Sequence, residues 1–163
     1  SSSLGGVYKL SGIEKDGEIV AKIKISNDPR KINNPGYKQV FRLFDKDNGM
    51  ALADLIALEG ESIDESAPLE IFHPLYTYKR KILTNFSAHK LLRPVFKEGK
   101  FVGVRRTVSE IARFSKEQKS KFWLEHLRNV HPQSYKVDLS QKLWDIRKSL
   151  INECNLNLKE KYV

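Results

Sequence analysis

Residues 39–58 read QVFRLFDKDNGMALADLIAL. Two mostly apolar runs, at 39–44 and 50–58, flank the segment DKDNG, whose residue types favour tight turns. The second run is short and follows a turn, which favours a strand over a helix. The two runs are therefore predicted to be consecutive strands, and they indicate a fold built around a β-sheet.

Further strands are predicted on both sides of this pair. Upstream, runs rich in β-branched residues at 7–10 and 19–25 flank the dipeptide Asp16-Gly17, which is typical of a β-hairpin. Downstream, short apolar runs predict strands at residues 69–74, 79–83, 91–96 and 101–104. Antiparallel strands are expected to dominate this part of the chain.

The spacing of apolar residues changes at Thr107, from two residues to three and four. Thr107 and Glu110 also match the capping-box pattern that begins a helix. The sequence therefore predicts an α+β fold, with mostly antiparallel strands in the N-terminal two thirds and helices in the C-terminal third. Its predicted parts are a linker at residues 1–3, a domain at 4–154 that is β-rich over 4–104 and helical over 107–154, and a flexible tail at 155–163.

A final helix is predicted to start near Asp138 or Ser140. Its apolar side carries Leu139, Leu143, Ile146, Leu150 and Cys154, at spacings of three and four residues. We expect this helix, including Trp144, to pack against the helices around Phe122 and Trp123.

The composition is that of a soluble globular protein, with 40% hydrophobic and 30% charged residues among 163. The longest apolar runs are far shorter than the roughly 20 residues that a membrane-spanning helix requires. Cys154 is the single cysteine, so an internal disulfide is excluded and a cytoplasmic location is expected.

The chain is basic, with a formal net charge of +9, and the charge is concentrated between residues 76 and 106. Nine basic residues in that stretch face one acidic residue, Glu98. The basic residues are Lys79, Arg80, Lys81, Lys90, Arg93, Lys97, Lys100, Arg105 and Arg106. Interleaved aromatic residues are compatible with a nucleic-acid-binding surface, and a solvated face of strands is the alternative.

Catalytic and metal-binding patterns are absent from the sequence. It contains neither a phosphate-binding loop nor a Gly-x-Ser-x-Gly nucleophile, and none of its four histidines has the spacing of a helical zinc site. We therefore predict no catalytic, cofactor-binding or metal-binding residue in this chain. His73, before Pro74, is predicted to hold a turn through a ring nitrogen.

Five blocks occur in a distinctive order along the chain. They are LGGVYKL at 4–10, KISNDPRK at 24–31, PGYK at 35–38 followed by Arg42, FHP at 72–74, and VDLSQKLW at 137–144. This order resembles the region that follows the catalytic barrel in nicotinate phosphoribosyltransferases. The only methionine is the internal Met50, so we also expect the chain to be a C-terminal fragment detached from its barrel.

The resemblance implies an enzyme of NAD salvage that joins nicotinate to phosphoribosyl pyrophosphate, giving nicotinate mononucleotide, and that uses ATP and magnesium. It places the catalytic groups on the barrel and the N-terminal domain, usually in a homodimer. The partners of this chain would then be that barrel and that N-terminal domain. The isolated chain is expected to be inactive.

Five residues of the chain are candidates for contact with the phosphate site or the barrel. Gly5 and Gly6 follow the position of a glycine-rich phosphate loop in the resembled family, and they are interpreted as a hinge or as a direct contact. Lys31, Lys38 and Arg42 are basic positions that recur in that family. They are expected to face the phosphoribosyl site or an acidic patch of the barrel, or else to form structural ion pairs.

Overall fold

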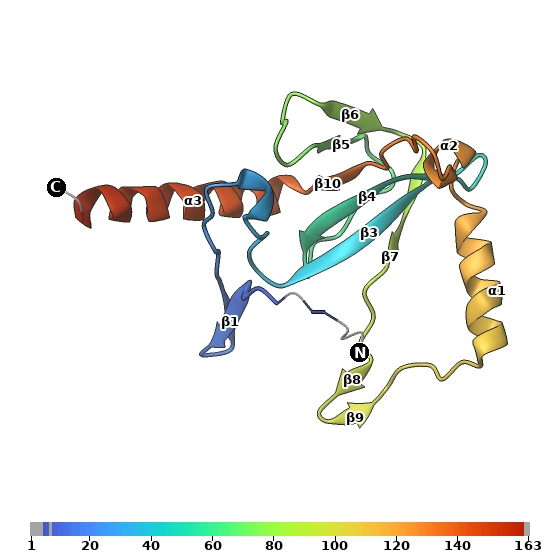
Figure 1. Ribbon diagram of the computed structural model, residues 1–163, viewed down its shortest axis with the longest axis horizontal. Coiled ribbons are helices and arrows are strands. Elements are labelled where there is room, and N and C mark those ends of the chain that lie inside the picture. The colour runs from blue at the N-terminus through green and yellow to red at the C-terminus, as the bar shows by residue number, and fades with distance from the viewer. Residues whose placement is uncertain (1–4, 7, 162–163) are drawn as a thin grey trace.

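The computed structural model describes residues 5–6 and 8–161, with side chains described as far as Asn155. Its centre is a six-stranded sheet in the order β6-β5-β10-β4-β3-β7, and two small hairpins and three α-helices surround it (Figure 1). The sheet strands are β3 (Lys38–Asp45), β4 (Ala51–Leu58), β5 (Leu69–Phe72), β6 (Arg80–Leu83), β7 (Phe86–Lys90) and β10 (Val137–Leu139). The hairpins are β1 (Gly12–Lys15) with β2 (Glu18–Ala21), and β8 (Phe96–Lys97) with β9 (Lys100–Phe101). The helices are α1 (Val108–Lys119), α2 (Leu124–Leu127), α3 (Gln141–Lys161) and the short 3-10 helix η1 (Pro29–Lys31). This arrangement confirms the predicted α+β fold.

The pair β3–β4 is the longest antiparallel pair, as the sequence predicts. Its turn is closed by side chains, because Asp45 Oδ1 accepts from the N–H of Asp47 at 2.8 Å and Asn48 Oδ1 accepts from Met50 at 2.8 Å. Gly49 has a φ of 70°, which residues other than glycine rarely adopt. The local sequence therefore specifies this turn.

The hydrophobic core lies on one face of the sheet. Alternate residues of β3 and β4 point into it, and strands β5, β6 and β7 of the same sheet contribute one residue each. Its buried members are Phe41, Leu43, Ala53, Leu55, Ala57, Ile71, Leu83 and Phe86. The two-residue alternation that predicted the strands thus also selects the core.

Four predicted strands are placed differently in the structure. The strand predicted at 19–25 is β2 at Glu18–Ala21, and the one predicted at 101–104 is β9 at Lys100–Phe101. The N-terminal hairpin turns at Asp16-Gly17 as predicted, but its first strand is β1 at Gly12–Lys15; residues 8–10 are not a strand, and Val7 lies outside the described residues. Residues 91–96 were predicted as a strand, yet β7 occupies residues 86–90 instead. The reason is burial. Phe86 is fully buried in the core, so the segment that contains it pairs with β3.

Strand β10 was missed, because residues 137–139 looked like the beginning of the last helix. The strand runs parallel to β4, with Leu139 opposite Ile56, and Leu139 also pairs with Phe72 of β5. The helix starts immediately afterwards, where the Ser140 hydroxyl accepts from the N–H of Leu143 at 3.2 Å. The predicted start near Ser140 is confirmed.

Helix α3 packs against the sheet rather than against the helices around Phe122 and Trp123, so that prediction is wrong. Leu143 is fully buried, and the Trp144 ring meets the Phe72 ring edge-on at 5.9 Å. Helix α3 lies against strand β4 of the sheet, and its Trp144 reaches Phe72 of β5. The backbone of α3 also remains helical to Lys161, past Asn155, where we had placed the start of the tail.

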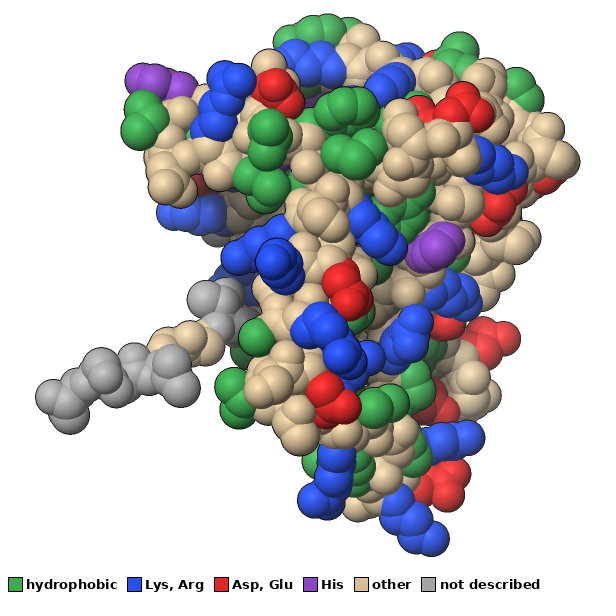
Figure 2. Space-filling view, turned by 90° about the vertical axis from the view of Figure 1, so that its right-hand side faces the viewer, with side chains coloured by type: hydrophobic (Ala, Val, Ile, Leu, Met, Phe, Trp, Pro, Cys, Tyr) green, Lys and Arg blue, Asp and Glu red, His purple; other side chains and the backbone are tan. Residues whose placement is uncertain are grey.

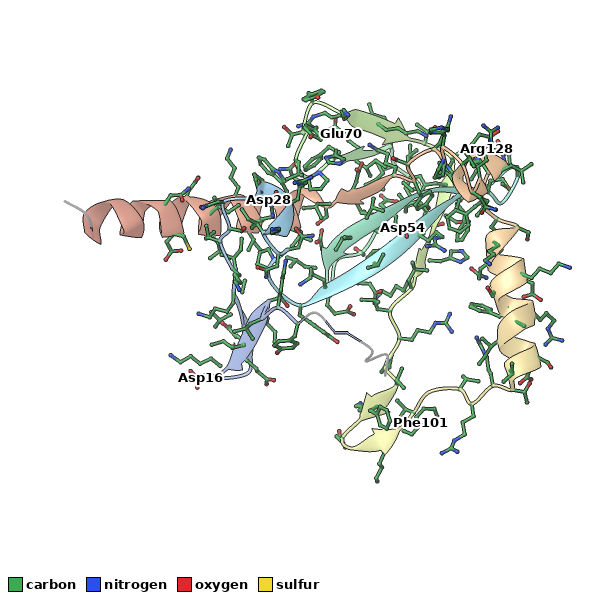
Figure 3. All side chains as sticks on the ribbon, in the orientation of Figure 1. Asp16, Asp28, Asp54, Glu70, Phe101 and Arg128 are labelled. Atoms are coloured by element: carbon green, nitrogen blue, oxygen red, sulfur yellow. The ribbon has the colours of Figure 1, made fainter. Side chains whose placement is uncertain are left out.

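Helix α1 stands apart from the sheet (Figure 1), and hairpin β8–β9 projects away from it, as the position of Phe101 in Figure 3 shows. The predicted capping box is present: Thr107 Oγ1 accepts from the N–H of Glu110 at 3.3 Å, and Glu110 Oε2 accepts from the N–H of Thr107 at 2.7 Å. No side chain of α1, all of which the structure describes, is buried.

Across residues 5–6 and 8–161, no helix is both long and apolar enough to cross a membrane.

Replacing Thr107 with Ala is expected to destabilise α1 by about 1 kcal/mol, because the N-cap hydrogen bond is lost. Since α1 buries no side chain, the change should appear as faster amide hydrogen exchange in its first turn. The unfolding midpoint of the whole chain should stay unchanged. Thr107→Ser is the matched control, because serine also caps helices. A lower global midpoint in the Ala variant alone would contradict this separation.

Candidate functional site

Arg42 and Asp54 form a largely buried ion pair on the sheet face opposite the core. The β3–β4 register places the two residues directly opposite each other. Arg42 Nε donates to Asp54 Oδ1 at 2.8 Å and Nη2 donates to Oδ2 at 2.9 Å, while the side chains are only 17% and 12% exposed. Paired parallel hydrogen bonds of this kind are among the stronger polar interactions in proteins.

Two aromatic residues complete this cluster. The Tyr135 hydroxyl donates to Asp54 Oδ1 at 3.0 Å, and the Arg42 guanidinium carbon lies 4.7 Å from the centre of the Phe122 ring. The hydrogen bond to Asp54 raises the pKa of Arg42, and burial followed by the Asp54 charge raises the pKa of Tyr135. Each polar group of the cluster has its partner within the cluster. These contacts attach Phe122, which follows α1, and Tyr135, which precedes β10, to the sheet. Figure 3 labels Asp54 within this region.

The structure places Arg42 in an ion pair of its own chain, which was one of the two alternatives for this residue. Lys38 lies four residues away in the same strand, about 13 Å from it along the backbone. The Lys38 ammonium donates to the carbonyl of Gly36 at 2.5 Å, and partial burial lowers its pKa.

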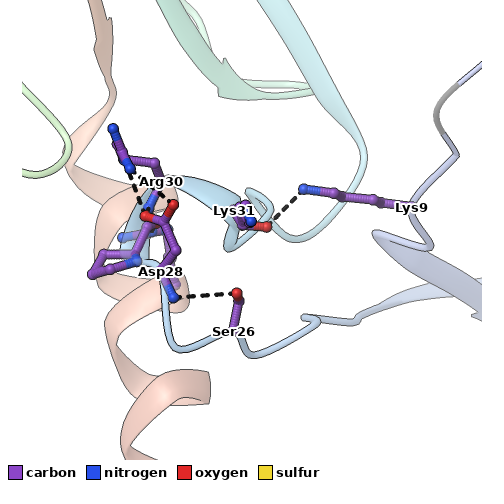
Figure 4. A network of polar contacts seen from close by, with 7 residues as sticks. Lys9, Ser26, Asp28, Arg30 and Lys31 are labelled. Carbon is purple, nitrogen blue, oxygen red and sulfur yellow. Dashed lines mark hydrogen bonds and ion pairs between the residues drawn. The ribbon is translucent and has the colours of Figure 1, made fainter.

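Lys31 lies in η1, away from strand β3. Asp28 caps this short helix by accepting from the N–H of Arg30 at 3.0 Å, and the Lys9 ammonium donates to the carbonyl of Lys31 at 2.6 Å (Figure 4). The Lys31 side chain itself is exposed.

Gly5 and Gly6 are exposed, and a Cβ atom added at either would meet no heavy atom within 4 Å. Neither lies in a helix or a strand. The five candidate residues therefore do not form one compact site, and their contacts with a phosphate or a barrel stay predictions.

His73 behaves as predicted from its place before Pro74. Its Nδ1 accepts from the N–H groups of Leu75 and Tyr76, both at 3.1 Å. The ring thus fixes the turn between β5 and β6.

A groove rich in cations runs from the start of β3, past the end of β7, to α1. It consists of two adjoining cavities of about 340 and 430 Å³ that share Lys90 and Arg93. We call it the basic groove and define it by Lys38, Lys90, Arg93, Arg106 and Lys121. Figure 2 looks onto the side of the molecule that carries α1, where Lys and Arg side chains run down the face with hydrophobic side chains among them.

The sequence indicated only part of this groove. Lys90, Arg93 and Arg106 belong to the basic stretch 76–106, whereas Lys121 follows α1 and was not considered with them. The partners of Arg42 were missed as well. A single Asp54 inside an apolar strand was the available signal, and the register that sets it opposite Arg42 could have been inferred from the turn.

The same side of the molecule exposes apolar surface. More than half of the large apolar side chains that are exposed in the described chain lie between residues 91 and 130. Val108 is 83% exposed, Leu124 76% and Phe96 67%. We call this surface the apolar arm and define it by Leu91, Leu92, Val95, Phe96, Phe101, Val102, Val104, Val108, Ile111, Phe114, Trp123, Leu124, Leu127 and Val130.

Comparison with known proteins gives a consistent result. Residues 37–147 match the model of the nicotinate phosphoribosyltransferase C-terminal domain. The nicotinate phosphoribosyltransferase of Bacillus subtilis (strain 168) is 36% identical over 158 residues, which cover 97% of this chain and 32% of that protein. That of Dictyostelium discoideum is 32% identical over 151 residues, covering 88% of this chain and 25% of the relative.

A crystal structure of human nicotinic acid phosphoribosyltransferase has a similar fold, with a TM-score of 0.64 and 26% identity over 72% of this chain and 23% of the human chain. The chain thus spans between about a quarter and a third of the length of these relatives. None of these matches supports a nucleic-acid-binding surface at residues 76–106. The chain belongs to the family of nicotinate phosphoribosyltransferase C-terminal domains.

Proposed function

We propose that this chain is the C-terminal domain of an enzyme that joins nicotinate to phosphoribosyl pyrophosphate, giving nicotinate mononucleotide in NAD salvage. The catalytic groups, and the sites for ATP and magnesium, lie in the remainder of that enzyme, which acts as a cytoplasmic homodimer. The chain supports the remainder by docking against it. Family membership, with coverage of only part of each relative, supports this proposal.

The apolar arm is the single observation that carries the docking role. Helix α1 has 12 residues and buries none of them, and isolated helices of that length are marginal in water. Large exposed apolar patches mark protein contacts in folded proteins. A partner that covers α1 would supply the tertiary packing that the helix lacks within this chain.

The contacts within the Arg42–Asp54–Tyr135 cluster support a structural rather than a catalytic role for Arg42. Each charged group there already has its partner inside the chain. A phosphate could bind Arg42 only by displacing Asp54 and leaving that largely buried carboxylate without its cation, which is unfavourable.

One experiment with two measurements tests the proposal. The purified chain is compared with the full-length gene product that contains it, under identical conditions. We expect amides of α1 to exchange at least about tenfold more slowly in the full-length protein, because the remainder covers the apolar arm. We also expect the full-length protein alone to form nicotinate mononucleotide from nicotinate, phosphoribosyl pyrophosphate and ATP with magnesium.

The amides of the central strand β4 provide the internal control, since they lie inside the sheet in both proteins. Equal exchange of α1 in the two proteins would refute docking through the apolar arm. Product formation by the isolated chain would refute the assignment of catalysis to the remainder.

A further inference from the structure

We propose that the basic groove binds an acidic segment of the remainder of the enzyme. This inference rests on the proposed function and adds the chemistry of the partner to it. It also moves the expected barrel contact away from Lys31 and Arg42, to cations on the α1 side of the molecule.

The groove holds its cations between two walls. Lys90 and Arg93 come from the end of β7 and the residues after it, and Arg106 and Lys121 come from either end of α1. Aromatic rings fix two of these cations. The Arg106 guanidinium carbon lies 4.6 Å from the centre of the Phe114 ring, and the Lys121 ammonium lies 5.2 Å from that of Phe44. Both distances are typical of cation–π contacts, so the charges are held at the groove.

Of the five groove cations, Lys90 alone has an ion-pair partner in the described part of the chain, and that partner, Glu59, also lines the groove. Among the residues that the structure describes, no carboxylate lies within 4.0 Å of Arg93, Arg106 or Lys121. Lys90 reaches Glu59 at 3.5 Å. Some other exposed cations do have a partner, such as Arg80 with Glu70 at 2.6 Å. Like charges collected in a concave surface raise the local potential and attract carboxylates.

The surroundings of the groove indicate that the occupant is a protein segment rather than a free ion. Leu91 and Phe114 line the groove and are 38% and 44% exposed, and Leu92, another member of the apolar arm, lines its second cavity. A small anion would leave this apolar surface in water. A segment that carries both carboxylates and apolar side chains would cover it and pair the cations at the same time.

The relatives indicate where such a segment would come from. They are three to four times longer than the part that this chain matches, so the proposed enzyme has a large remainder. A chain with a net charge of +9 is complemented best by an acidic surface on that remainder.

Zero-length carbodiimide cross-linking of the full-length gene product tests this pairing, because it joins lysine amines only to carboxylates in contact with them. We expect peptides that contain Lys121 to be linked to an Asp or Glu outside these 163 residues. Lys116 is exposed on α1 but does not line the groove, so its yield of such links should be at least about tenfold lower. The Lys90–Glu59 link serves as the internal positive control.

Two variants of the full-length protein sharpen the result. Lys121→Arg keeps the charge but cannot form the amide, so the Lys121 link should vanish while α1 stays protected from hydrogen exchange. Arg106→Glu places a repelling carboxylate in the groove and should lower the yield of the Lys121 link by about tenfold. Because both side chains are exposed, neither change should unfold the sheet.

The possible outcomes separate this inference from the function beneath it. Protection of α1 without any external link to Lys121 would overturn the acidic segment and leave docking intact. Links from Lys121 only to carboxylates of another copy of these 163 residues would also overturn it. An unprotected α1 in the full-length protein would overturn both proposals.

Discussion

Replacing Lys136 with Met is expected to lower the free energy of unfolding by about 3–5 kcal/mol, because it leaves a buried carboxylate without its cation. Asp138 is 0% exposed, and the Lys136 ammonium lies 3.0 Å from its Oδ2. Within the described part of the chain, neither carboxylate oxygen of Asp138 accepts a hydrogen bond. The ion pair is therefore the main compensation for burying this charge.

The second substitution at this pair provides the control. Replacing Asp138 with Leu in the Lys136→Met background should restore most of the lost stability, since a buried ion pair is often exchanged for apolar residues at little cost. Denaturant unfolding of all variants, with the slope held constant, gives the comparison. If Lys136→Met alone costs less than about 1 kcal/mol, Asp138 must be neutralised in another way.

Replacing Arg42 with Met is expected to cost about 3–5 kcal/mol as well, because it breaks the bidentate pair with Asp54. Asp54 would retain only the Tyr135 hydroxyl, while Phe122 would lose the cation against its ring. The effect should reach beyond the sheet, since these contacts hold the segments around Phe122 and Tyr135 in place.

Arg42→Lys is the matched variant, because it keeps the charge but cannot form two parallel hydrogen bonds. Its cost should be clearly smaller than that of Arg42→Met and still measurable by denaturant unfolding. Equal stability of the wild-type and Met proteins would show that the pair contributes nothing net. It would also reopen a ligand-binding role for Arg42.

Local chemistry explains which parts of the fold the sequence predicted. The turn after β3 depends on Asp45, Asn48 and Gly49, which act on their own backbone neighbours. The capping box of α1 involves Thr107 and Glu110, three residues apart. The His73 turn is equally local. Interactions between residues close in sequence leave a pattern that can be recognised without the fold.

The candidate site could be predicted only in part, because its members come from distant segments. The cations of the basic groove come from β3, from the end of β7 and from both ends of α1, and the compositional cluster at 76–106 contains three of the five, lacking Lys38 and Lys121. Tyr135 reaches Asp54 across 81 positions of sequence. No spacing rule connects such residues until the strands have paired.

The sequence by itself determined the α+β class, the central hairpin, the capping box of α1 and, through its ordered blocks, the resemblance to one enzyme family. Only the tertiary structure decided that residues 137–139 form a strand and that α3 packs on the sheet. A three-residue strand has little preference of its own, and β10 exists because β4 and β5 offer it hydrogen-bond partners on both sides. The side of α3 that carries Leu143 and Trp144 likewise packs where Phe72 lies. Phe72 precedes these residues by about 70 positions, so it comes within reach only once the sheet has formed.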